Sequence, residues 1–179
     1  RTSSALQFAM GVAHSGKRVL LVDADPVRFL ATKAFEAEGR TGFSDLLERQ
    51  TLPGDGTDVV MSTVHENLSF LPAGSTMAKS ASDYTDEQLQ GVLEHLKSVA
   101  DVIVFDTPPC DVFADATRLS ESVNEVFMVV SANSTNYAQI PNGYELLTRA
   151  GAKEVSLVLT DASPTEEPFT GTQSYAKSA

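Results

Sequence analysis

VLLVDAD (residues 19–25) is an uninterrupted apolar run that ends in two carboxylates, and a second run of this kind, VIVFDTPP (residues 102–109), contains Asp106 at its end. Apolar runs without alternation are typical of parallel strands that helices cover on both faces. The carboxyl ends of such strands meet at one edge of the sheet, where ligands bind in open α/β folds. We therefore expect Asp23, Asp25 and Asp106 to converge at that edge. The alternative is that these acidic residues simply end their strands in solvated loops.

Helical and strand patterns alternate along the rest of the chain. They predict helices over 3–14, 28–38, 42–49, 86–98, 113–121 and 136–150, and further strands over 67–72, 125–131 and 154–160. This alternation implies right-handed crossovers between parallel strands. We predict one α/β domain over residues 1–162, with a parallel sheet and helices on both faces. The Pro-, Thr- and Ser-rich residues 163–179 are expected to form a flexible tail.

The composition excludes several classes of protein. The chain carries 13 basic and 24 acidic residues, a formal net charge of −11, which argues against nucleic-acid binding and against docking alone on an anionic membrane. No apolar stretch approaches the ~20 residues of a membrane span, and the first residues do not form a signal peptide. The single cysteine, Cys110, rules out an internal disulfide, and its acidic neighbours favour an inert thiol. We therefore expect a cytoplasmic protein without direct membrane insertion.

The chain opens at a helix. Nucleotide-binding α/β domains begin with a strand and a glycine-rich phosphate loop that precede such a helix. Residues 1–4 (RTSS) stand where the end of that loop would be. Losing the strand would expose two strand edges and a large apolar surface. We therefore expect the first strand and the phosphate loop to lie outside this sequence.

Several segments, taken in order, resemble one family. They are TSSALQFAMGVAHSGKRVLLVDAD (2–25), GFSDLLE (42–48), NLSFLPAG (67–74), VIVFDTPP (102–109) and EVFMVVSANST (125–135). Together they resemble the deviant-Walker P-loop ATPases that include MinD and ParA. Within that group the chain is most similar to the tyrosine kinase domains of bacterial capsule and exopolysaccharide export systems. The resemblance implies a P-loop NTPase fold that binds ATP and Mg²⁺.

The resemblance also implies roles for residues at the carboxyl edge of the sheet. Thr2 would ligate Mg²⁺ through its hydroxyl, at the start of a helix. Asp106 would orient a Mg²⁺-bound water, and Asp23 would help to hold the metal site. Asp25 would lie near the γ-phosphate, as the base for an attacking tyrosine hydroxyl or water. With Thr2, Asp23 and Asp106 it would also belong to the metal site, and Asp23 would take part in catalysis through that site.

Residues at both ends of the similar region depart from the family pattern. Arg1 takes the place of the phosphate-loop lysine, and a planar guanidinium is not equivalent to a compact ammonium. Arg1, Thr2 and Ser3 would face the nucleotide, and Arg1 would also stabilise charge during transfer. Thr160 and Asp161 stand where the family commonly has an asparagine that contacts adenine.

The implied function is a tyrosine kinase of bacterial capsular or exopolysaccharide synthesis and export. It would act as a homo-oligomer at the inner face of the membrane, through a membrane adaptor protein or an upstream segment. Two alternatives stay open. Pro26, together with a tail whose lone tyrosine is Tyr175, favours a MinD/ParA-like positioning switch in which ATP hydrolysis controls dimerisation. Arg1 and the changed adenine position favour a degenerate, non-catalytic adaptor with the same fold.

Overall fold

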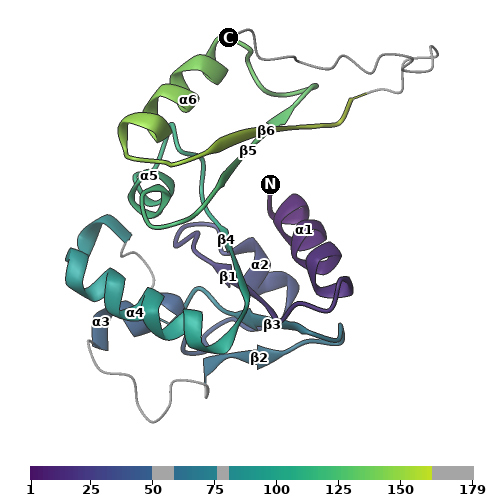
Figure 1. The fold of residues 1–179 in the computed structure, drawn as a ribbon, viewed down its shortest axis with the longest axis vertical. Helices are drawn as coiled ribbons and strands as arrows, with labels where there is room; N and C mark the ends of the chain where they lie inside the picture. The colour runs from purple at the N-terminus through teal and green to yellow at the C-terminus, as the bar shows by residue number, and fades with distance from the viewer. Residues whose placement is uncertain (50–58, 76–80, 163–179) are drawn as a thin grey trace, which may run out of the picture.

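The computed structural model describes residues 1–49, 59–75 and 81–162 (Figure 1). The helices are α1 (Thr2–His14), α2 (Leu30–Ala34), α3 (Phe43–Arg49), α4 (Asp86–Val99), α5 (Asp115–Ser120) and α6 (Gln139–Arg149), with a 3₁₀ turn over Ala81–Asp83. The strands are β1 (Val19–Asp23), β2 (Met61–Ser62), β3 (Leu68–Leu71), β4 (Val102–Asp106), β5 (Val126–Ser131) and β6 (Val155–Thr160). The predicted tail over 163–179, with Tyr175, lies outside the described residues.

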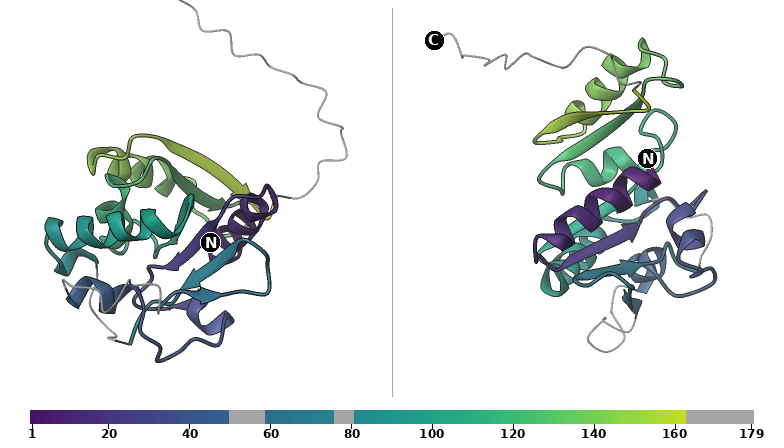
Figure 2. Two further views of the ribbon diagram at one scale, coloured as in Figure 1. Left: turned by 60° about the horizontal axis from the view of Figure 1, so that its bottom comes forward. Right: turned by 90° about the vertical axis from the view of Figure 1, so that its right-hand side faces the viewer.

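The strands form two sheets with mainly parallel pairing. In the first, the order is β2-β3-β1-β4, and β1 is parallel to both β3 and β4. In the second, β5 pairs with β6 in parallel. Figures 1 and 2 show the second sheet, with α5 and α6, on one side of the molecule and the first sheet on the other. The predicted α/β class is confirmed.

Two features correct the prediction of one continuous parallel sheet. β2 pairs antiparallel with β3, and its two residues are too few for a periodic pattern to reveal. The strands also form two separate sheets, and the break between the sheets falls between β4 and β5. Within the described residues, no strand pairs with the edge of β4 opposite β1 or with the edge of β5 opposite β6. β4 is therefore only half-buried over residues 102–105, although its sequence is as apolar as that of β1.

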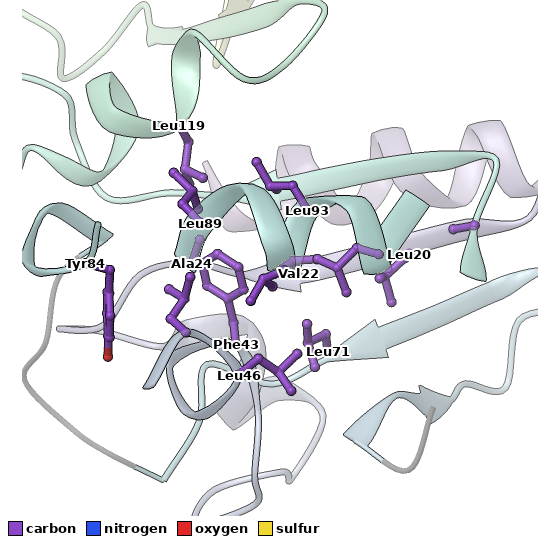
Figure 3. Close-up of a cluster of buried hydrophobic side chains, with 14 residues drawn as sticks. Leu20, Val22, Ala24, Phe43, Leu46, Leu71, Tyr84, Leu89, Leu93 and Leu119 are labelled. Atoms are coloured by element: carbon purple, nitrogen blue, oxygen red, sulfur yellow. The ribbon is translucent and has the colours of Figure 1, made fainter. Parts of the chain in front are cut away.

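The position of β1 explains its uninterrupted apolar sequence. All five of its residues are buried, and alternate side chains enter two different cores. Leu20 and Val22 pack with apolar residues of α3 and α4 (Figure 3). Val19 and Leu21 pack on the other face, in a cluster that includes Ala9 of α1. Helices therefore cover both faces of this sheet, as predicted.

Helix α1 also reaches the second sheet. The ring of Phe8 on α1 lies 4.9 Å from that of Phe127 on β5, centroid to centroid, in a tilted arrangement. Aromatic pairs at this separation attract each other in addition to the area that they bury. Figure 2 shows α1 between the two sheets.

Helix α2 is shorter than predicted. The sequence pattern extends over 28–38, whereas the helix covers only Leu30–Ala34. Phe29 before it and Glu36 after it both have positive φ, of 37° and 51°, which is outside the right-handed helical region. Apolar periodicity carries no information about such backbone breaks, so the prediction was too long.

Helix α4 begins where its local sequence predicts. Thr85 accepts a hydrogen bond from the backbone N–H of Gln88, and the Gln88 side chain accepts one from the N–H of Thr85. The Gln88 amide also donates to the carbonyl of Leu47, which ties α4 to α3. Among the described helices, none is long and apolar enough to cross a lipid bilayer.

Candidate nucleotide site

The three predicted carboxylates come together at the carboxyl ends of β1 and β4. Asp23 and Asp106 are direct partners in the parallel register, and Asp25 follows two residues after Asp23. All three are buried, with exposures of 0% for Asp23, 7% for Asp25 and 4% for Asp106. Like charges at one edge of a sheet repel one another, and burial adds to the cost of ionising them.

Asp106 has the most perturbed environment of the three. Burial, together with the charges of Asp23 and Asp25, raises the pKa of its carboxyl to about 6, although a hydrogen bond from the Thr2 side chain opposes the shift. Its Oδ2 atom is buried and accepts no hydrogen bond within the described part of the chain. A buried carboxylate oxygen without a partner is costly, and a ligand that donates to it or coordinates it would relieve that cost.

Asp23 has a different role, because the protein itself occupies both of its oxygens. Oδ1 accepts a hydrogen bond from the backbone N–H of Asp25 at 3.2 Å. Oδ2 accepts one from the Thr32 N–H at 2.7 Å and one from the Thr32 hydroxyl at 2.8 Å. Burial raises the pKa of Asp23, while these hydrogen bonds oppose the shift. The geometry makes Asp23 an anchor for neighbouring backbone.

Asp25 keeps one oxygen for other partners. Its Oδ1 accepts hydrogen bonds from the N–H groups of Val27 at 3.0 Å and Arg28 at 2.9 Å. These bonds form a local turn of the kind that Asp side chains make with the backbone that follows them. The turn fixes the direction of the Asp25 carboxyl, while the Arg28 side chain extends into solvent.

The structure brings Thr2 to this edge of the sheet. The other predicted residues are Arg1, Ser3, Thr160 and Asp161, and they take no part in the hydrogen bonds described above. Arg1 precedes α1 and makes no side-chain capping bond, and both it and Ser3 are exposed. Thr160 and Asp161 end β6 in the second sheet, where the Thr160 hydroxyl donates to the Val130 carbonyl at 3.5 Å. No hydrogen bond within the described residues links Thr160 or Asp161 to the three carboxylates.

Cys110 lies near Arg1, although it is not activated. Burial raises the pKa of its thiol, the charge of Asp111 raises it further, and the charge of Arg1 opposes the shift. A raised pKa keeps the thiol protonated and unreactive at neutral pH. This agrees with the prediction of an inert residue.

The donor atoms at this edge suit a hard cation that retains water ligands. No group of three or more His, Cys, Asp or Glu side chains in the described residues is arranged to hold a metal by itself. Mg²⁺, however, usually binds through one or two protein oxygens together with waters and substrate phosphates. The unpartnered Asp106 Oδ2 and the adjacent Thr2 hydroxyl supply oxygens of that kind.

A second polar network near the site could not be found from sequence. The buried carboxylate of Asp45 on α3 accepts hydrogen bonds from the N–H of Gly42 and the N–H of Ser75, both at 2.8 Å, and from the Ser75 hydroxyl at 2.6 Å. The Gly42–Asp45 bond is local and resembles a helix-start signal. The bonds to Ser75 span 30 residues, so only the tertiary structure reveals them.

The raised pKa of Asp106 makes a testable prediction for the ligand-free protein. Because its folded-state pKa is about 6 rather than 3.8, the stability that its neutral form contributes is complete below pH ~4 and is lost as the pH rises through 6. Asp106→Asn removes this titration. In EDTA, urea unfolding should show the variant gaining about 3 kcal/mol relative to wild type between pH 4 and pH 8. A stability difference that does not change with pH would contradict the assignment.

An α/β fold of parallel strands, with carboxylates at their carboxyl edge beside the start of a helix, defines the chain as a P-loop NTPase-like protein. The family described as an AAA domain matches residues 1–150, and the chain belongs to this family.

Known relatives extend over most of the chain. The tyrosine-protein kinase YwqD of Bacillus subtilis is 24% identical over 159 residues, covering 89% of this chain and 66% of YwqD. The crystal structure of the chimerical protein CapA2B2 matches with a TM-score of 0.77 and 26% identity, covering 87% of this chain and 67% of that chain.

The fold is also found outside the kinases. The structure of cobyrinic acid a,c-diamide synthase from Mycobacterium smegmatis, with a bound ATP analog and magnesium, matches with a TM-score of 0.73 at 16% identity. It covers 88% of this chain and 68% of that chain, and at this identity the likeness concerns the fold alone. The present chain spans about two thirds of the length of YwqD, of CapA2B2 and of this synthase.

Proposed function

We propose that this chain is the nucleotide-binding domain of an ATP- and Mg²⁺-dependent tyrosine kinase of bacterial capsular or exopolysaccharide synthesis. The observation that carries the proposal is Asp106, a buried carboxylate with one unpartnered oxygen, beside Thr2 at the start of α1. The relatives named as tyrosine-protein kinases support the activity, and the ATP analog and magnesium in a protein of the same fold support the ligand.

In this proposal Asp106 and Thr2 hold Mg²⁺, which neutralises charge on the nucleotide phosphates. The start of α1 places backbone N–H groups and the positive end of the helix dipole toward phosphate. Asp25 accepts the proton of the attacking tyrosine hydroxyl, because its turn holds one oxygen and leaves the other available. Arg1 replaces the phosphate-loop lysine as the cation nearest the phosphates, and Ser3, Thr160 and Asp161 complete the contacts to the nucleotide.

A second candidate function is a positioning switch of the MinD/ParA kind, favoured by the Asp25-Pro26 dipeptide that follows β1. In the kinase, by contrast, the domain works as a homo-oligomer with a membrane adaptor protein. The two functions differ in where the phosphoryl group goes. A kinase leaves it on a tyrosine, whereas a switch releases it to water.

The kinase proposal is tested by incubating the full-length protein with ATP and Mg²⁺ and mapping phosphotyrosine by mass spectrometry. Wild type should become phosphorylated on tyrosine, and Asp25→Asn should lower the rate by about 100-fold or more, since general bases contribute about 10²–10⁴. Omitting Mg²⁺ is the first control. ATP-dependent dimers without phosphotyrosine would overturn the kinase in favour of the switch.

A further inference from the structure

Thr32 on α2 is a buried residue that is linked to the candidate site by its hydrogen bonds to Asp23. Its side chain is 2% exposed, and its hydroxyl donates to Asp23 Oδ2 at 2.8 Å while its own N–H donates to the same oxygen at 2.7 Å. Thr32 follows Asp23 by nine positions in the chain. It lies in the segment LATKA (30–34), which carries no catalytic motif.

Asp23 acts as the missing cap of helix α2. The residue before this helix, Phe29, has a left-handed backbone with φ of 37° and makes no side-chain capping bond. The N–H that such a cap would normally satisfy is that of the third helical residue, Thr32. Asp23 reaches it from the end of β1, so a five-residue helix that would be unstable alone is held against the strand.

The Thr32 hydroxyl extends the network in the opposite direction. Its oxygen accepts a hydrogen bond from the backbone N–H of Ala73 at 2.9 Å. Ala73 belongs to the turn after β3, and its carbonyl accepts the N–H of Ser44 at the start of α3. One hydroxyl therefore links Asp23, α2 and the turn at residues 72–74.

Asp23 transmits this constraint to Asp25. Its second oxygen, Oδ1, holds the backbone N–H of Asp25, and the Asp25 carboxylate in turn accepts the N–H groups of Val27 and Arg28. A rotation of the Asp23 carboxyl would therefore shift the Asp25 peptide. The hydroxyl of Thr32 prevents the rotation, because it adds a second bond to Oδ2 and anchors the pair to the turn.

We propose that Thr32 is a positioning residue of the nucleotide site, which orients Asp25 through Asp23. The inference rests on the proposed function insofar as Asp25 is the base, and it goes beyond it by assigning a role to a residue that contacts neither nucleotide nor metal. It also makes Asp23 an internal anchor instead of a direct metal ligand.

The test compares Thr32→Val, which keeps the shape and removes the hydroxyl, with Thr32→Ser, which keeps the hydroxyl. Thr63→Val is the matched control, because the Thr63 hydroxyl bonds the Leu68 carbonyl at 2.8 Å near the start of β3, at the opposite end of the strand. Two quantities are measured on each full chain: kcat and KM for ATP, and the amide hydrogen-exchange rates of Asp25 and Ala73 by NMR.

Thr32→Val should lower kcat about tenfold or more while KM changes by less than about threefold, because a misplaced base affects the transition state more than the bound substrate. The Asp25 and Ala73 amides should exchange about tenfold faster, since each loses a bond or its support. Thr32→Ser should restore both quantities, and Thr63→Val should leave both near wild type.

Exchange of the Asp25 amide that is unchanged in Thr32→Val, or that rises equally in Thr63→Val, would overturn the proposal. Faster exchange with an unchanged kcat would overturn it as well, because Thr32 would then be structural only. If wild type itself transfers no phosphate, the proposed function fails. In that case faster Asp25 exchange confined to Thr32→Val still supports the positioning of Asp25, and its absence still rejects it.

Discussion

Replacing Asp106 with asparagine is expected to weaken Mg²⁺-dependent ATP binding by about 10- to 100-fold, the range typical when a group that hydrogen-bonds the ligands of a metal is removed. The physical reason is the loss of a negative charge at the oxygen that has no protein partner. Asparagine has nearly the same shape, so the effect reports charge rather than packing. In the ligand-free protein the same substitution should gain stability relative to wild type as the pH rises through 6, so the pH dependence of stability and the effect on ATP binding are expected to have opposite signs.

The measurement is calorimetric titration of ATP into the full-length protein, with and without Mg²⁺, at pH 8, where Asp106 is ionised. Asp101→Asn is the matched control, because Asp101 lies just before β4 at the other end of the strand and is exposed beside Arg18. Equal affinities of wild type and Asp106→Asn would remove Asp106 from the site. An absence of detectable binding to wild type would reject both the kinase and the switch, and would leave the non-catalytic adaptor.

The second large effect is expected at Gly42, which precedes α3. A Cβ atom there would lie 2.1 Å from the Pro72 carbonyl oxygen and 2.6 Å from the Gly74 nitrogen, and both are backbone atoms that cannot rotate away. The turn is held in place, because the Phe43 N–H donates to that same Pro72 oxygen at 2.8 Å. Gly42→Ala should therefore cost about 3 kcal/mol or more of folding stability, at the upper end for overpacked sites.

Urea unfolding of Gly42→Ala and Gly91→Ala tests this expectation. A Cβ at Gly91 has no atom within 4 Å, and the residue is exposed within α4, so alanine should gain up to about 1 kcal/mol there. A loss of stability in Gly42→Ala together with a gain in Gly91→Ala would support the close approach of α3 to the turn after β3. A loss below about 1 kcal/mol in Gly42→Ala would show that the two segments separate more readily than the contact distances imply.

Much of the site could be predicted because its elements are encoded locally. An apolar strand with carboxylates at its end identifies both the strand and its ligand-facing edge, and parallel pairing then places Asp23 beside Asp106. Thr2 was expected from the order of segments and is indeed adjacent to Asp106. Nothing in the local pattern distinguishes Asp23 from Asp25. In the structure both carboxylate oxygens of Asp23 accept hydrogen bonds from the protein, whereas Asp25 accepts them through Oδ1.

The sequence by itself determined the α/β class, the order of the helices and of the strands other than β2, and the carboxylates at the strand ends. Periodicity and strand endings are properties of neighbouring residues, so they can be read without knowing the fold. The tertiary structure alone decided that α2 is short, that the strands divide between β4 and β5, and that Thr32 and Ser75 hold the polar network. These features depend on backbone breaks and on hydrogen bonds between residues far apart in the chain, which no local pattern encodes.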